Sequence, residues 1–218
     1  MHGISLHGAG TIDGVEFNGH RALNNVLHGA YVGNGINVAF NGGTFAGNDS
    51  GNTTTYDGIN VAANIEKFAI RGVKAGQASG MPATQRYGIV VEPGTSNNYE
   101  IIGNDLQGNV TSGIYDGGTG TAKIVKDNLT GETVDVASVA AVTLPYSGDY
   151  FNITGTDNIT SITASWVGRR VTLKFADILT FTDGSNLKIA GNFVTTADDT
   201  ITLICDGTNW IELSRSVN

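Results

Sequence analysis

The sequence repeats a short phrase, Gly-Ile-x-Val, at Gly35-Ile36-Asn37-Val38, Gly58-Ile59-Asn60-Val61 and Gly88-Ile89-Val90-Val91. A fourth copy, Gly113-Ile114-Tyr115-Asp116, ends in aspartate instead of valine. The copies begin 23, 30 and 25 residues apart, a range in which a sustained period indicates a solenoid. The stretch from Gly35 to Gly131 is therefore predicted to wind through several similar turns.

Each repeat also contains a second and a third strand. The second strand follows the Gly-Ile-x-Val strand as Asn64–Ile70 and Asn98–Ile102, and more loosely as Ala122–Val125. Three short strands per turn, separated by glycine and asparagine, predict a right-handed parallel β-helix. Its inward apolar side chains stack on their equivalents about 4.8 Å away in the next turn. The third strands are expected in Gly43–Asn48, Gly103–Asn109 and Asp127–Gly131.

The composition fits a soluble chain of strands and turns. The 218 residues include 31 glycines and only three prolines, which permits many turns and keeps the backbone donors that a sheet needs. The formal net charge is -8, without a basic cluster, so nucleic acid is not an expected partner. No signal peptide or membrane span is expected. Cys205 lies in an apolar run and is predicted to be a buried thiol.

Two polar stretches interrupt the repeat, at Asn48–Tyr56 and Ala75–Tyr87. Both end in a tyrosine close to the next Gly-Ile pair. Insertions in a solenoid form loops on its surface, commonly on the binding face. These loops, and the outward side chains beside them, are therefore predicted to carry the ligand site.

The pattern changes after Gly131. Glu132–Ala141 is predicted to be a lid or connector, and from Val142 onward short apolar strands alternate with turns at a spacing of roughly ten residues. This spacing predicts an antiparallel β-sandwich or prism. The expected architecture is all-β with two domains, residues 1–141 and 142–218. The expected core of the second domain is Phe151, Ile162, Val171, Leu173, Phe175, Leu203 and Ile211.

The second domain resembles the terminal domain of tailspike and tail-fibre proteins of tailed bacteriophages, in Tyr150–Ile162, Gly168–Phe175, Asn186–Gly191 and Trp210–Arg215. With the preceding solenoid, the resemblance covers nearly the whole chain. It implies a homotrimer that acts in the virion tail, with the second domain as its trimerisation element and a further carbohydrate-binding surface. Members of this family attach virions to bacterial capsule or lipopolysaccharide, and many cleave it; the fold alone does not decide between the two.

The first turn is expected to need a partner. No polar cap precedes the apolar positions that begin near Gly3, and solenoids need a polar terminal unit. The chain is therefore expected to be the C-terminal part of a longer protein, or to dock its first turn on a partner such as an upstream protein of the virion tail.

Hydrolysis of a polysaccharide needs two carboxylates, about 5 Å apart in a retaining enzyme or about 6.5–9.5 Å apart in an inverting one. Glu66 and Glu100 are expected at the same outward position on adjacent turns, with backbones about 4.8 Å apart. Lys67 and Lys123 are expected beside them, so the alternative is a row of solvent-exposed charges without a catalytic role. The catalytic residues therefore stay undetermined. A second pair of weak candidates is Glu92 and Asp116.

Binding without cleavage needs aromatic faces, on which sugar rings stack, and polar groups for the hydroxyls. Tyr56 and Tyr87 are expected at equivalent positions, with Tyr115 one turn further on, and they are predicted to form a shallow strip for a glycan. The alternative is that these tyrosines cap corners of the coil and are half-buried. Further candidate contacts are Asp57 and Arg86 at a corner of the same turns, and Trp210 in the second domain, where Trp166 and Trp210 also suit the core or a trimer interface.

No cofactor or metal is expected. The sequence has no nucleotide-binding glycine motif and no Gly-x-Ser-x-Gly elbow. The histidines, expected at the surface or between subunits, are His2, His7, His20 and His28. Three functions remain open: a host-recognition module that binds bacterial polysaccharide, a polysaccharide-cleaving glycosidase or lyase, and a purely structural trimerisation end. The shortness of the solenoid favours binding over cleavage.

Overall fold

The computed structural model describes residues 1–131, 135–146 and 148–218, and all regular structure in them is strand. The chain is therefore all-β, as expected. It divides into two compact units, Met1–Glu132 and Thr133–Asn218. The described part of the chain contains no helix with the length and apolarity that a membrane crossing requires.

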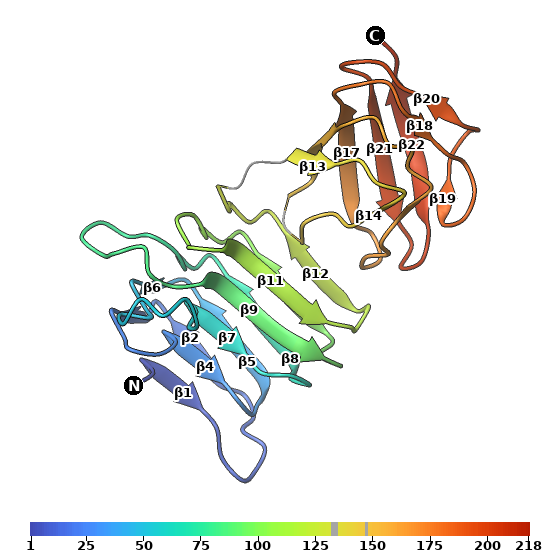
Figure 1. Ribbon diagram of the computed structural model, residues 1–218. Helices are drawn as coiled ribbons and strands as arrows, with labels where there is room; N and C mark the ends of the chain where they lie inside the picture. Colours follow the sequence, from blue (N-terminus) through green and yellow to red (C-terminus); the bar gives the residue numbers. More distant parts are fainter. Residues whose placement is uncertain (132–134, 147) are drawn as a thin grey trace. The chain divides into compact units, whose positions relative to one another are not determined.

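The first sheet of the Met1–Glu132 unit contains five strands in the order β1-β4-β7-β9-β11, and each neighbouring pair is parallel. Figure 1 shows these strands side by side, from blue β1 to yellow-green β11. Successive strands of this sheet belong to successive turns of the chain. Their bounds are Ile4–Leu6 (β1), Ala30–Val32 (β4), Ile59–Val61 (β7), Tyr87–Gly94 (β9) and Ser112–Gly118 (β11).

A second parallel sheet has the order β12-β10-β8-β5-β2. A third line of pairing begins with β3 (Arg21–Leu23) and β6 (Thr44–Ala46), which are also parallel. It continues as single bridges at Lys74, Asp105 and Leu129, so the predicted third strands of the later turns are reduced to one paired residue each. The second sheet consists of Glu16–Asn18 (β2), Ile36–Asn41 (β5), Glu66–Arg71 (β8), Tyr99–Ile102 (β10) and Lys123–Lys126 (β12).

The register corrects the first copy of the repeated phrase. Ile59, Ile89 and Ile114 do lie opposite one another in the first sheet. Ile36 instead pairs with Glu66 in the second sheet. The residue opposite Ile59 is Ala30, so the true copies begin at Gly3, Gly29, Gly58, Gly88 and Gly113. Both strands of a turn can begin with glycine and a small or apolar residue, and this made the two positions look alike.

These glycines form a column that leaves room for a ladder of buried side-chain amides. A Cβ at Gly58 would lie 2.5 Å from the Gly88 carbonyl oxygen and 2.9 Å from Gln85 Nε2. The amide of Asn48 donates to Gln85 Oε1 at 3.1 Å, and the amide of Gln85 donates to Asn109 Oδ1 at 2.8 Å. Each amide thus satisfies its neighbour inside the protein, where an unmade hydrogen bond is costly.

Gly58→Ala is expected to lower the free energy of unfolding of the first unit by about 1–3 kcal/mol, because the new methyl group overlaps a backbone oxygen and the amide ladder. Chemical denaturation followed by circular dichroism measures the change. Gly51→Ala is the control: its Cβ would make only an ordinary contact, 3.5 Å from a methyl carbon of Thr53. Equal stability of the two variants would contradict the role given to the glycine column.

The Thr133–Asn218 unit contains a mixed sheet with the order β13-β15-β17-β21-β22-β19. The pairs β13/β15, β15/β17 and β19/β22 are parallel, whereas β17/β21 and β21/β22 are antiparallel. The prediction of a purely antiparallel domain is therefore wrong. The six strands are Asp135–Ala137 (β13), Tyr150–Thr154 (β15), Arg170–Phe175 (β17), Leu187–Lys188 (β19), Thr200–Cys205 (β21) and Trp210–Ser216 (β22).

Parallel pairing arises because the chain alternates between this sheet and two small ones. Ala141–Val142 (β14) pairs in parallel with Ser161–Ile162 (β16), and Thr180–Phe181 (β18) pairs with Phe193–Val194 (β20) in antiparallel. Strand β13 precedes the predicted boundary after residue 141 and β14 crosses it, but both pair within the second unit and belong to it. The predicted lid of the solenoid is thus partly sheet of the second unit, and its residues 132–134 lie outside the described residues.

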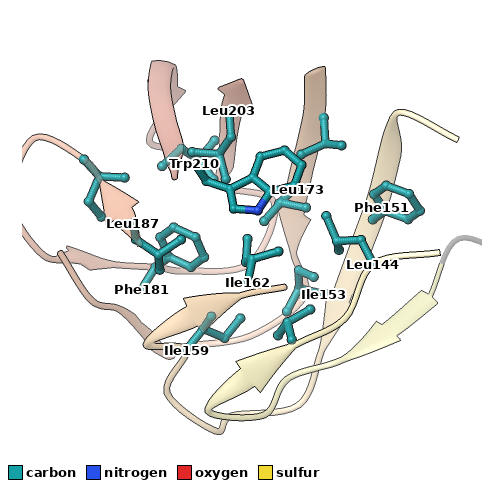
Figure 2. Packing of buried hydrophobic residues seen from close by; sticks show 14 of the residues in the cluster. Leu144, Phe151, Ile153, Ile159, Ile162, Leu173, Phe181, Leu187, Leu203 and Trp210 are labelled. Carbon is teal, nitrogen blue, oxygen red and sulfur yellow. The ribbon is translucent and has the colours of Figure 1, made fainter. Parts of the chain in front are cut away.

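The second unit has one apolar core, shown in Figure 2. Trp210 lies at its centre with no exposed surface, and its Nε1 donates to the Thr163 carbonyl at 3.2 Å. Cys205 is buried, as predicted. Ile211 is 39% exposed and was wrongly expected in the core, because alternation along the strand turns it outward when Trp210 points inward. The other expected core residues are buried: Phe151, Ile162, Val171, Leu173, Phe175 and Leu203.

Candidate functional site

The outward side of the first sheet carries a row of paired residues that has a tyrosine at each end. Register places Tyr31 of β4 opposite Asn60 of β7, Asn60 opposite Val90 of β9, and Val90 opposite Tyr115 of β11. Asn60 and Val90, in the middle of this row, are buried. We call this surface the tyrosine face, and its half-buried members are Tyr31, Tyr56, Arg86, Tyr87, Glu92 and Tyr115.

Asp57 anchors the tyrosine face from below. Its carboxylate has no exposed surface and receives both Nε and Nη2 of Arg86, each at 3.0 Å. The amide of Asn60 and the backbone N–H of Tyr87 also donate to it, at 3.0 and 3.3 Å. Burial alone would raise the pKa of Asp57, but hydrogen bonds from His28, Arg86 and Asn60 outweigh burial and lower it. Asp57 is therefore an ionised carboxylate that holds Arg86 in place, and a ligand cannot reach it.

Arg86 is held between this carboxylate and an aromatic ring. Its guanidinium lies 5.0 Å from the centroid of Tyr87, a cation–π distance. The ring of Tyr87 in turn lies 5.7 Å from that of Tyr115. The hydrogen bonds that Arg86 donates to Asp57 raise the pKa of Arg86. The predicted contacts Tyr87, Tyr115 and Arg86 thus come together in one rigid group.

Glu92 is placed by the same buried framework. The amide nitrogen of Asn60 donates to Glu92 Oε1 at 2.8 Å and to Asp57 Oδ2 at 3.0 Å. One side chain therefore fixes two carboxylates, the first half-buried and the second fully buried. Glu92 keeps a second oxygen with which a carboxylate can accept hydrogen bonds from a ligand.

Aromatic rings also gather on the earlier turns. His28 stacks on His2 at 5.3 Å and on Tyr31 at 5.9 Å, and the ring of Tyr56 meets His28 edge-on at 5.1 Å. Nδ1 of His28 lies 3.3 Å from Oδ2 of Asp57, and the carboxylate of Asp57 joins this group to Arg86. His28 is buried, so the expectation that it lies at the surface is wrong.

The tyrosines do not occupy the equivalent positions that the sequence suggested. Tyr87 lies opposite Ser112 in the register, and the same register places it level with Asp57. The residue level with Tyr56 is Arg86, whose N–H donates to the Tyr56 carbonyl. The strip is therefore staggered, with Arg86 between the ring of Tyr56 and the pair of Tyr87 and Tyr115.

Glu66 and Glu100 do not form a pair on adjacent turns. Register places Glu100 opposite Ala69, whereas Glu66 bridges Asn97, three residues earlier. Glu100 forms an ion pair with Arg71, and Glu66 is exposed. The prediction of two adjacent carboxylates at these positions is wrong, because the alignment of the second strands was shifted by three residues.

Asp116 is buried away from the tyrosine face. It accepts a hydrogen bond from the Tyr99 hydroxyl, and the ammonium of Lys123 lies 2.9 Å from its second oxygen. Lys123 also lies 5.6 Å from the ring centroid of Tyr99. Asp116 therefore serves as a packing contact of the last turn and does not face the same side as Glu92.

The two polar loops each have a buried, hydrogen-bonded end next to the amide ladder. Asn48 and Asp49 are fully buried, and Asp49 receives the N–H groups of Thr53 and Thr55. Residues 50–55 are exposed. The second loop is fastened to the first, since the Thr84 hydroxyl donates to the Asn48 carbonyl at 2.7 Å. Each loop is thus anchored where it meets the amide ladder.

Trp210 is not a ligand platform. It has no exposed surface and its indole N–H is bonded within the second unit, so no ring face is open to a sugar. Tyr31, Asn60 and His28 also belong to the site, and the sequence pattern did not predict them there. The correct repeat beginning at Gly29 could have identified Tyr31, because it places this tyrosine at the same outward position as Tyr115.

Within the described ranges, no group of three or more histidine, cysteine, aspartate or glutamate side chains is arranged to hold a metal ion. No protein family, curated protein or solved structure matches the chain.

Proposed function

We propose that this chain is a host-recognition module of a bacteriophage tailspike or tail fibre, and that its tyrosine face binds bacterial surface polysaccharide. In this proposal the first unit is a short right-handed parallel β-helix. The three lines of parallel pairing, with successive turns stacked in register, support that reading. Parallel crossovers within one sheet are almost always right-handed.

The single observation that carries the binding function is the row of half-buried rings interleaved with fixed polar groups. Tyr31, Tyr87 and Tyr115 offer apolar faces for the C–H sides of sugar rings. Arg86 and Glu92 lie among them, each held by a buried partner, and are ready to bind hydroxyl groups. Because these side chains are already ordered, little conformational entropy is lost on binding.

We further propose that the chain acts as a homotrimer in the virion tail, with the second unit as its trimerisation element. Large apolar side chains exposed on this unit support a contact with further copies. A mass of three chains in light scattering is the expected result, and a mass of one chain would exclude the trimer. The exposed large apolar residues in the described part of this unit are Val139, Tyr146, Tyr150, Val167, Ile178, Val194, Ile211, Leu213 and Val217.

Tyr115→Ala and Tyr31→Ala are each expected to weaken binding of the recognised polysaccharide about tenfold, about 1.4 kcal/mol, because each removes one aromatic contact. A screen of purified bacterial polysaccharides against the immobilised chain finds the ligand, and calorimetry measures the affinities. Ile124→Ala removes an exposed apolar side chain from the second sheet of the first unit and is the control, with unchanged affinity expected. Weaker binding by Ile124→Ala alone would move the site to the second sheet.

Cleavage of the polysaccharide is a second candidate, favoured by one observation: Asp57 and Glu92 bind the same amide nitrogen. Retaining glycosidases use two neighbouring carboxyl groups about 5–5.5 Å apart. Complete burial of Asp57 and its two bonds to Arg86 argue against it, because a nucleophile or a base needs access to the substrate. New reducing ends that appear with the wild type and vanish with Glu92→Gln would establish cleavage and exclude simple binding.

A further inference from the structure

We infer that the tyrosine face selects an uncharged, hydroxyl-rich sugar chain and rejects one that carries carboxylates. This inference rests on the proposed binding function and narrows its ligand. It concerns the charge that remains on the face after every internal contact has been satisfied.

The cation of the face is already neutralised. Arg86 directs both Nε and Nη2 to the buried carboxylate of Asp57. This two-point geometry is the one by which arginine would also bind a carboxylate of a ligand. The carboxylate of Asp57 cannot turn away into water, because it is buried and also bonded to Asn60 and Tyr87. A carboxylated sugar would thus compete for an arginine that has a permanent internal partner.

The other basic residues of the first unit that form ion pairs do so elsewhere. Arg71 pairs with Glu100 on the second sheet, and Lys74 pairs with Asp105 on the third line of strands. Lys123 pairs with buried Asp116. Each of these contacts lies away from the side chains of the tyrosine face, so none of them supplies it with a positive charge.

The charge that remains on the tyrosine face is the negative charge of the Glu92 carboxylate, which needs hydrogen-bond donors from a ligand. The carboxylate of Glu92 is fixed through one oxygen by Asn60. An ionised carboxylate only accepts hydrogen bonds. Sugar hydroxyls satisfy it, whereas a uronic or sialic acid would bring a second negative charge beside Glu92. Because the charges of Asp57 and Arg86 cancel, the tyrosine face has a net charge of about -1. This charge repels an acidic glycan.

The test uses one polysaccharide in two forms. The ligand found by the screen is measured as isolated and again after its primary hydroxyls have been oxidised to carboxylates. We expect the oxidised form to bind at least tenfold more weakly in 20 mM NaCl. Part of the loss should be recovered in 500 mM NaCl, because salt screens the repulsion. The affinity of the uncharged form should stay constant over the same range of salt.

Glu92→Gln distinguishes the repulsion between carboxylates from the loss of the sugar's primary hydroxyl groups, which oxidation also causes. It removes the charge but keeps the shape and one acceptor, so it should reduce the penalty for the oxidised form at low salt. Thermal melting of Glu92→Gln verifies that the variant is folded. A screen that selects carboxylated polysaccharides, or an oxidised form that binds as tightly as the uncharged one, overturns this inference while leaving the binding function intact. Failure to bind any polysaccharide overturns both.

Discussion

Trp210→Ala is expected to lower the free energy of unfolding of the second unit by about 3–5 kcal/mol, the typical cost of removing a fully buried tryptophan. The indole has no exposed surface, fills the centre of the core and donates to the Thr163 carbonyl. The variant would therefore lose its packing and one internal hydrogen bond. Chemical denaturation followed by circular dichroism measures the change.

The neighbouring Ile211→Ala is the matched control, because this side chain points outward from the same strand and is 39% exposed. Its cost should stay within about 1 kcal/mol. The two variants together separate a core residue from a ligand contact. A Trp210→Ala protein with normal stability but lost polysaccharide binding would return Trp210 to the binding site and contradict the account of the second unit.

Asp57→Ala should have the next largest effect, a loss of about 3 kcal/mol from the first unit. Removing one partner of a buried ion pair costs about 3–5 kcal/mol. The lower end applies because the Arg86 side chain is 31% exposed and can turn into water when its partner is gone. Polysaccharide binding should weaken as well, since Arg86 is no longer held against Tyr87. Asp105→Ala, which breaks the exposed pair with Lys74, is the control and should cost less than about 1 kcal/mol.

The pH dependence of this variant gives an independent test. The pKa of Asp57 is lowered in the folded protein, where hydrogen bonds from His28, Arg86 and Asn60 outweigh the opposing effect of burial. The unfolded chain therefore binds the proton more readily. The stability that Asp57 contributes is complete above its unfolded pKa, about 3.9, and is lost as the pH falls through the folded value. Asp57→Ala should accordingly lose less stability between pH 5 and pH 2 than the wild type.

The sequence predicted the strands of the first unit well, and the register less well. Alternating apolar residues at Ile59, Val61 and Ile89 mark inward positions in any arrangement of strands. To predict which strands pair in successive turns, one must also know how many residues each connection between strands contains. Gly35-Ile36 begins a strand of the second sheet, whereas the true partner of Ile59 is Ala30, which does not look like a core residue until its neighbours are known.

The second unit shows a different limit. Short strands at regular spacing suggested hairpins, and β21 and β22 do form one. Between β13 and β17, however, the chain passes to a small sheet and back before it pairs again, which makes neighbouring strands of the large sheet parallel. Strand spacing alone cannot distinguish these two routes.

Part of the candidate site was accessible from sequence. The loop ends identified Tyr87, Tyr115 and Arg86, and these side chains do meet. The burial of Asp57 and its link through Asn60 to Glu92 depend on contacts between turns about 30 residues apart. No local pattern encodes such contacts. The same holds for Trp210, whose inward direction is set by the pairing of β22.

A crystal structure of the chain with an oligosaccharide of the recognised polysaccharide tests the central claim most directly. We expect sugar rings lying on Tyr87 and Tyr115, with hydroxyl groups bonded to Glu92 and Arg86. Sugar bound only on the second unit, or on the outward side of the sheet formed by β2, β5, β8, β10 and β12, would contradict it.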